Sequence, residues 1–286
     1  METGNKIKPL HRLLNQEIYV KNADILHLSI QINSSSIFFL IVDENLTEFK
    51  VFLHFEFDKD LNSTQIAENI DQIILENKIL DSNFKSTSIS ISNYINCIVP
   101  KEYFDKNKVL DILKFNHNID FKLTEKFEFI EPINSYILFT VPFEIYTSLN
   151  SNYKNSVWKS SSQIFLKQLY KNNYIDKHNF YLYIEEEHIE IAFFENSNLI
   201  FFNCFSYKTM NDIIYFLLNI FEKLNLRAHE NEINITGQVD QNSFIHVELD
   251  KIFHKVNFIG RKKNMNCKIS NSIKLHKYYK IFNQHK

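Results

Sequence analysis

Residues 181–205, YLYIEEEHIEIAFFENSNLIFFNCF, predict three short strands joined by two tight turns. Apolar side chains recur at alternate positions on both sides of EEE (185–187) and of ENS (195–197). Alternation with a period of two is typical of a half-buried strand, because successive side chains of a strand point to opposite faces. The polar, acidic composition of the two connections indicates tight turns between antiparallel neighbours.

The same order of elements occurs earlier in the chain. Residues 26–57 contain the alternating segments LHLSIQIN, SIFFLIV and FKVFLHFEF. The apolar spacing of residues 63–80 then predicts a helix that begins at Asn62 or Ser63, and the strand SISIS follows it. This block of three strands, a helix and a strand is therefore expected to form one unit of the fold.

The second block continues in the same way after residue 205. A helix with a broad apolar face is predicted over 209–226, with Thr209 as its N-cap, and INIT at 233–236 is the next strand. The two blocks agree in pattern and order rather than in residue identity, as Ile30 with Leu182 illustrates. A repeat of this length predicts a duplicated domain rather than a solenoid.

We therefore expect two lobes. Residues 1–150 form the N-terminal lobe, with extra elements at about 93–150, and residues 151–286 contain a linking helix, the second lobe and a basic tail. Further elements are expected in this order: a helix over 102–115, two strands interrupted by Pro132, the linking helix at about 157–170, a helix around 243–254 and a strand over 255–260.

Glycine is scarce, and this excludes whole classes of function. The chain has three glycines, where about twenty are typical for its length. Neither GxGxxG nor GxxxxGK[ST] is present, so the sequence excludes a Rossmann cofactor site and a P-loop.

The remaining composition predicts a cytoplasmic protein. The three cysteines are far apart and form no CxxC, which favours reduced thiols over disulfides or a structural zinc site. The longest apolar run, 213–218, is too short to span a membrane, and the N-terminus lacks a signal peptide's apolar core. No membrane association is expected.

Two β-β-β-α-β halves resemble the duplicated actin-like ATPase fold, a ribonuclease H-like α/β fold with mixed sheets and flanking helices. LHLSIQIN (26–33), INITGQVDQNSF (233–244) and LHKYYKIFN (275–283) carry a narrower resemblance to an uncharacterised bacterial family, a domain of unknown function. The resemblance spans about residues 20–283. It implies two lobes around a central cleft and brings no established activity.

In ATP-hydrolysing proteins of this fold, the first strand of each half ends in an Asp-x-Gly turn that holds phosphate and organises the metal. By this resemblance, Gln31 and Asn33 take the Asp and Gly positions of the first turn. Tyr183 and Glu185 take those of the second. Carboxylates beside a polyanion repel it unless a cation intervenes. The resemblance thus implies that both phosphate turns are degenerate and that ATP hydrolysis is absent or vestigial. It implies no catalytic residues and no cofactor.

The cleft candidates retain two interpretations each. Ser34-Ser35-Ser36 is either a set of anion donors or a polar turn, and the second is favoured. The turn 185–188, EEEH, is either a divalent-ion site or a solvated turn, and again the second is favoured. Gly237 marks either a ligand cleft or a positive-φ turn. The full set of degenerate cleft candidates is Gln31, Asn33, Ser34, Ser35, Glu185 and Gly237.

The C-terminal tail is strongly basic. Residues 261–286 contain eight Lys or Arg and no Asp or Glu, interleaved with aromatic residues. This composition permits nucleic-acid binding. A last strand, HKYYKIF (276–282), followed by a frayed basic end is the favoured interpretation, since no nucleic-acid motif is present.

The predicted function is a non-catalytic interaction or scaffold module that uses the cleft or a sheet edge to hold a protein partner. The alternative is an ATP- or ADP-binding protein with an altered phosphate grip that uses Ser34–Ser36 and Gly237. A second alternative is a nucleic-acid-associated factor that uses the tail.

Overall fold

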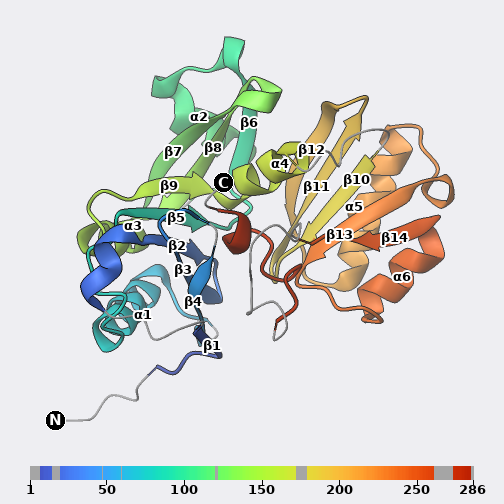
Figure 1. Cartoon of the computed structure of the whole chain (residues 1–286). Coiled ribbons are helices and arrows are strands. Elements are labelled where there is room, and N and C mark those ends of the chain that lie inside the picture. The colour runs from blue at the N-terminus through green and yellow to red at the C-terminus, as the bar shows by residue number, and fades with distance from the viewer. Residues whose placement is uncertain are drawn as a thin grey trace.

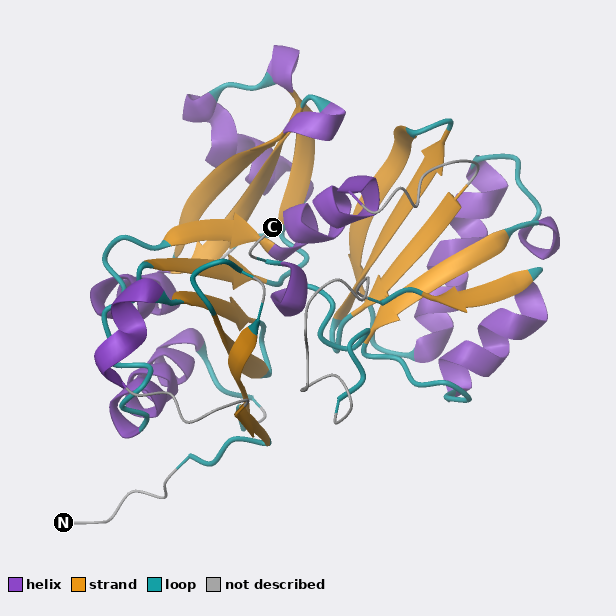
Figure 2. Ribbon diagram, viewed as in Figure 1, coloured by secondary structure: helices purple, strands orange, loops and turns teal. Residues whose placement is uncertain are grey.

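The computed structural model describes residues 7–14, 20–46, 48–58, 60–119, 122–171, 179–260 and 273–284. Two twisted sheets lie side by side, each with helices on its outer face, and a smaller sheet extends from the first (Figures 1 and 2). The C-terminal segment 273–284 lies between the two large sheets (Figure 1).

The first lobe is built on a six-stranded sheet. In spatial order its strands are β1 (His11–Leu14), β4 (Phe49–Glu56), β3 (Ser36–Val42), β2 (His27–Ile32), β5 (Ser86–Ile91) and β9 (Val157–Ser160). β2, β3 and β4 are antiparallel neighbours, whereas β5 joins β2 in parallel and β9 joins β5 in parallel. Helices α1 (Ser63–Glu76) and α3 (Phe143–Asn152) contribute apolar side chains to one face.

The second lobe repeats this topology. Its strands, in spatial order, are β12 (Asn198–Ser206), β11 (His188–Glu195), β10 (Asn179–Ile184), β13 (Glu232–Gly237) and β14 (Lys255–Phe258). Their directions match those of β4, β3, β2, β5 and β9. Helices α5 (Met210–Lys223) and α6 (Phe244–Ile252) cover the outer face. The prediction of two β-β-β-α-β halves in a mixed α/β fold is therefore confirmed.

The predicted helix caps can be checked directly. The Asn62 side chain accepts a hydrogen bond from Gln65 N (3.0 Å), and Gln65 Oε1 accepts one from Asn62 N (3.0 Å). This reciprocal pair satisfies two backbone donors at the start of α1. In the second lobe α5 starts after Thr209, whose backbone N–H donates to the Asp212 carboxylate (2.8 Å).

Asn62→Ala is expected to lower the free energy of unfolding by about 1 kcal/mol, because the backbone N–H of Gln65 loses its side-chain acceptor. Urea denaturation of the variant measures this loss. Glu68→Ala is the matched control, since Glu68 lies on the exposed face of the same helix and outside the cap. The control should change stability by less than about 0.5 kcal/mol. Equal losses in both variants would contradict the assigned cap.

The extra elements of the first lobe differ in part from prediction. They form a three-stranded sheet of β6 (Asn96–Pro100), β8 (Ser135–Pro142) and β7 (Leu123–Ile130), with α2 (Val109–Asn116). The two strands around Pro132 are confirmed. The predicted helix over 102–115 is wrong in its first half, which consists of two 3-10 turns. Asp105 accepts from Asn107 N (2.9 Å) there, and such local bonds compete with an α-helix.

The linking helix is also shorter than predicted. α4 spans Ser161–Lys171, and residues 157–160 before it form β9. Val157 and Trp158 favour an extended strand, and the parallel pairing with β5 decides the outcome. The predicted helix around 243–254 and strand over 255–260 correspond to α6 and β14.

The central strands of both large sheets are buried on both faces, so the prediction of half-buried strands is wrong for them, whereas the edge strands β1 and β12 remain partly exposed. Every residue of β3 is buried, and in β11 seven of eight are buried. Helix α4 and the segment 273–284 pack against the faces that the two sheets turn toward each other. Tyr278 and Phe282 pack against the first sheet, and Tyr279 packs against the second.

The predicted strand at 276–282 is absent. Residues 275–280 form turns, and a 3-10 helix follows at Ile281–Asn283. Residues 278–284 are all buried, so this end is not frayed up to Gln284. The spacing of Tyr278, Ile281 and Phe282 suits one helical face, and contact with the first sheet selects that geometry. Residues 261–272 of the basic tail lie outside the described residues.

Candidate functional site

The two turns that resemble phosphate turns meet across the junction of the lobes. The first, residues 33–35, connects β2 to β3, and the second, residues 185–187, connects β10 to β11. The Ser35 hydroxyl donates a hydrogen bond to the Glu186 carboxylate. Asn33 Oδ1 shapes the first turn by accepting from Ser35 N (3.0 Å). A direct polar contact therefore joins the two turns across the junction of the lobes.

A cavity of about 400 Å³ lies beside this contact. Asn33 and Ser34 line it from the first turn, and residues 185–188 line it from the second. Its apolar side comes from the first lobe: Leu61, Ile66, Ile91, Ile95, Pro142 and Ile145. The cavity thus has an apolar wall in one lobe and an acidic wall in the other.

The carboxylates that line this cavity make it acidic. Glu185, Glu186 and Glu187 line it, and its lining residues include no Lys or Arg. Burial, together with the negative charge of these three carboxylates, raises the pKa of the neighbouring Tyr207 to about 12. The local potential is therefore negative, which disfavours a polyanion such as a nucleoside triphosphate.

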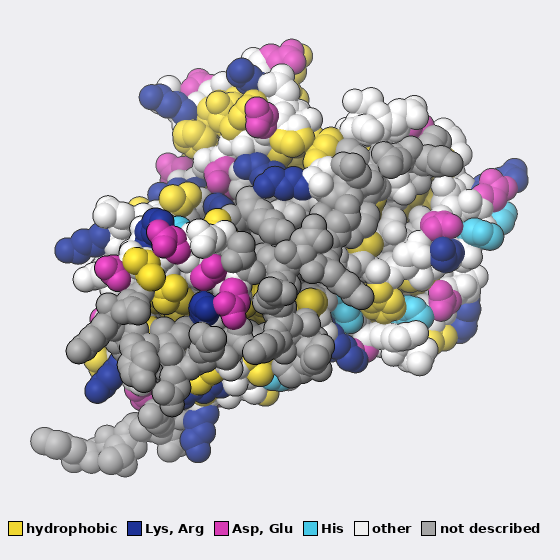
Figure 3. Space-filling view, in the orientation of Figure 1, with side chains coloured by type: hydrophobic (Ala, Val, Ile, Leu, Met, Phe, Trp, Pro, Cys, Tyr) yellow, Lys and Arg dark blue, Asp and Glu magenta, His cyan; other side chains and the backbone are white. Residues whose placement is uncertain are grey.

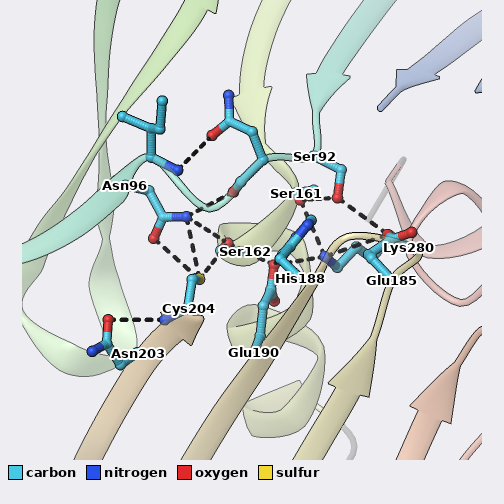
Figure 4. Close-up of polar contacts among 12 residues, drawn as sticks. Ser92, Asn96, Ser161, Ser162, Glu185, His188, Glu190, Asn203, Cys204 and Lys280 are labelled. Atoms are coloured by element: carbon cyan, nitrogen blue, oxygen red, sulfur yellow. Dashed lines mark hydrogen bonds and ion pairs between the residues drawn. The ribbon is translucent and has the colours of Figure 1, made fainter. Parts of the chain in front are cut away.

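A buried polar network lies behind the second turn (Figure 4). Lys280 Nζ is fully buried and donates to Glu190 Oε1 (2.7 Å) and to Ser161 Oγ (3.1 Å). It also lies 3.8 Å from Glu185 Oε1 and 3.9 Å from the centre of the Tyr183 ring. The lysine of this network thus comes from the C-terminal segment.

The network closes through hydroxyl groups of the first lobe and α4. Ser161 Oγ donates to Ser92 Oγ (3.0 Å), which donates to Glu185 Oε1 (3.1 Å). Ser162 Oγ donates to Glu190 Oε1 (2.8 Å). Charged and hydroxyl groups from four parts of the chain are thereby joined in one network (Figure 4).

Glu190 is ionised in this network. Burial by itself would raise the pKa of its carboxyl, but the charge of Lys280, with the nearby His188, holds that pKa below its ordinary value. A fully buried carboxylate needs such a partner, because desolvation alone would favour the neutral form. Lys280 therefore compensates the buried negative charge of Glu190 in the second lobe.

Gln284 attaches the same segment to the first lobe. Its Nε2 donates to Ile30 O (3.1 Å) and Ser88 O (2.8 Å), and its Oε1 accepts from Ser90 Oγ (2.8 Å). At the other end of the segment, Gly237 N donates to His276 O (3.0 Å) in the second lobe. Residues 276–284 therefore bond to both lobes.

The structure brings together four of the six cleft candidates. Asn33, Ser34, Ser35 and Glu185 lie at the junction of the lobes. Gln31 is 4% exposed on β2 and is not among the residues that line the cavity. Ser36, proposed with them as an anion donor, is buried against His54 Nε2 (3.2 Å).

Gly237 also lies outside the cavity lining. Its backbone conformation explains why this position holds a glycine. Its φ is +95°, and a Cβ there would lie 2.1 Å from Ile184 O. Of the two interpretations, the positive-φ turn is the one that agrees with this geometry. The close approach of β13 to β10 requires the absence of a side chain.

Sequence reasoning missed Lys280, Ser92, Ser161 and Gln284. The alternation in HIEIAFF offered one signal, because Glu190 falls on a face of a strand that turns out to be covered. A carboxyl group that stays ionised at such a position needs a positively charged partner. The sequence does not show which of the many lysines provides it.

Comparison with known proteins places the chain in a family. Residues 15–256 match the model described as "Protein of unknown function (DUF3822)". The chain belongs to this family. A comparison with curated protein sequences gave no match. The resemblance to an uncharacterised bacterial family, which the sequence segments predicted, is thereby confirmed. The DUF3822 description assigns no activity.

Solved structures similar to this DUF3822 member establish the fold. One is a Bacteroides thetaiotaomicron protein with an actin-like ATPase fold and unknown function, with a TM-score of 0.78, 21% identity, and 85% of this chain and 94% of that chain covered. Another is the PilM-PilN type IV pilus biogenesis complex, with a TM-score of 0.62, 9% identity, and 90% and 96% covered. The actin-like fold is confirmed, and at these identities the likeness shows the fold alone.

Two further properties concern the described residues only. Among them, no three His, Cys, Asp or Glu side chains are grouped so that they could hold a metal ion. None of the helices in the same ranges has both the length and the apolar character required to cross a bilayer.

Proposed function

We propose that this DUF3822 protein is a non-catalytic, cytoplasmic interaction or scaffold module that holds a protein partner in the cavity between its lobes. One observation carries the proposal: the two turns that resemble phosphate turns are bonded to each other, and three carboxylates line the adjoining cavity. A site with this lining suits a neutral or cationic group better than a phosphate.

The residues do not fit a magnesium nucleotide. Positioned amides or cations normally hold its phosphates. Here Glu185 and Asn33 stand where the resemblance puts glycines, and the cavity lining includes no Lys or Arg. A carboxylate and a hydroxyl engage each other across the junction. These features support a protein that has kept the two-lobed fold without the phosphate grip.

The described part of the tail does not favour nucleic acid either. Lys274 and Lys277 both pair with Asp240, each at 2.6 Å, and Lys280 is buried. Three basic side chains of the tail are thus engaged within the protein. PilM, a neighbour in fold, is solved in complex with PilN, which supports the use of this fold for protein binding.

Thermal unfolding with and without millimolar Mg-ATP and Mg-ADP tests the proposal. No shift of the melting temperature is expected. A nucleotide at about 100 times its Kd would add about 2.7 kcal/mol of stability, which for a chain of this size is a shift of several degrees. Such a shift, abolished by Asn33→Asp or Ser35→Ala, would overturn the proposal in favour of a nucleotide-binding protein.

A further inference from the structure

We infer that the cavity between the lobes binds a lysine or arginine side chain flanked by apolar residues, presented by a basic segment of a protein partner. This inference rests on the proposed function and names the chemistry of the partner. It combines two properties of the cavity, the sign of its charge and the apolar character of its opposite wall.

The acidic wall has two carboxylates that form no ion pair with any of the described residues. Glu186 and Glu187 are exposed, and no ion pair to either is found within the described residues. Glu186 accepts one hydrogen bond from Ser35, which leaves further acceptor capacity on its two oxygens. Glu185 differs, because Ser92 and Lys280 already satisfy it. An incoming cation would thus meet two carboxylates at the mouth of the cavity.

The buried side of the same wall adds a polar group. His188 is 4% exposed and lines the cavity, and its Nε2 has no hydrogen-bond partner in the described part of the chain. Glu190 Oε1 is 3.9 Å away, too far for a good hydrogen bond. The charged groups that face His188 are Glu190 and, through it, Lys280.

The opposite wall suits the apolar stem of a basic side chain. Long lysine and arginine side chains pack their methylene groups along apolar surfaces and keep the charged end at polar groups. The isoleucine, leucine and proline side chains of the first lobe offer such a surface, and Tyr94, which is 40% exposed, extends it toward solvent. A volume of about 400 Å³ is within the range of ordinary ligand pockets.

An apolar wall of this extent favours a peptide over a simple polyamine. A polyamine supplies charge but no side chains to cover the apolar surface. A segment with apolar residues next to its basic residue supplies both, and exclusion of water from the wall then adds to the charge attraction.

Fluorescence anisotropy with three labelled seven-residue peptides tests the inference. One alternates leucine with lysine and arginine, the second has glutamate at the basic positions, and the third has serine at the leucine positions. The full-length protein should bind the first most tightly, and binding should weaken as salt is raised. In the double variant Glu186→Gln with Glu187→Gln, the Kd for the leucine, lysine and arginine peptide should be about ten times the wild-type value.

Matched variants distinguish this site from general acidity. Glu102→Gln with Glu222→Gln removes the same charge from exposed positions outside the cavity and should leave the Kd unchanged. Tyr94→Ala should weaken binding of the leucine peptide more than that of the serine peptide. Thermal unfolding confirms that each variant is folded.

Several results would overturn the inference. They are equal binding by the two double variants, preference for the glutamate peptide, absence of binding by all three peptides, and binding of spermidine without binding of the basic peptide. None of these would by itself revive a nucleotide site. That outcome requires a thermal shift with Mg-ATP, so the failure of the inference and the failure of the proposed function are separate results.

Discussion

Lys280→Met is expected to lower the free energy of unfolding by about 3–5 kcal/mol, since it leaves a buried carboxylate without its counter-charge. Glu190 and Lys280 are both fully buried, with Lys280 Nζ 2.7 Å from Glu190 Oε1. Methionine keeps most of the apolar stem, so the variant removes the charge with little change of volume. Urea denaturation at pH 7 measures the loss.

The double variant Lys280→Met with Glu190→Gln is the control. It removes both charges and should recover much of the lost stability, because a neutral amide is far less costly to bury than an ion. A loss below about 1 kcal/mol in Lys280→Met, or no recovery in the double variant, would contradict the ion pair as the cause.

The pH dependence of this loss has a defined sign. In the wild type the folded pKa of Glu190 is lowered, so its contribution to stability is present above the ordinary carboxyl pKa and disappears as the pH falls through the folded value. In Lys280→Met burial should raise that folded pKa above the ordinary value. The penalty is then full at neutral pH and declines as protonation neutralises Glu190. The difference between wild type and variant should therefore shrink between pH 7 and pH 4.

Gly237→Ala is expected to lower the free energy of unfolding by about 2–4 kcal/mol, through backbone strain and steric overlap together. The φ of +95° is unfavourable for alanine, and the new Cβ would lie 2.1 Å from the backbone oxygen of Ile184. Parallel strands β10 and β13 must separate to admit it, and Gly237 N would then lose its bond to His276 O. Chemical denaturation gives the size of the loss.

Gly260→Ala is the matched control. A Cβ at Gly260 meets no atom of the described residues within 4 Å, and its φ is not positive. This variant should keep its stability within about 0.5 kcal/mol of the wild type. If the two glycine variants were equally stable, the close approach of β13 to β10 would not be the reason for a glycine at position 237.

Local sequence patterns were sufficient for most of the fold. The alternating residues of SIFFLIV and HIEIAFF predicted strands, and the apolar spacing after Asn62 and Thr209 predicted helices with the correct starts. These signals are local, because a period of two or of 3.6 residues and a cap depend on neighbours within a few positions. The turns at Asn33 and Glu185 could be located for the same reason.

The sequence by itself therefore determined most of the strands and helices, the order of the two halves and the acidic character of the second turn. Only the tertiary structure decided which faces are covered and which charges meet. Lys280 and Glu190 are 90 positions apart, and Gln284 bonds to Ile30 across 254. Periodicity shows that a side chain belongs on a face, but the segment that covers this face is selected by packing and charge compensation across the whole chain. For this reason HKYYKIF was predicted as a strand, whereas it folds as the buried connection between the lobes.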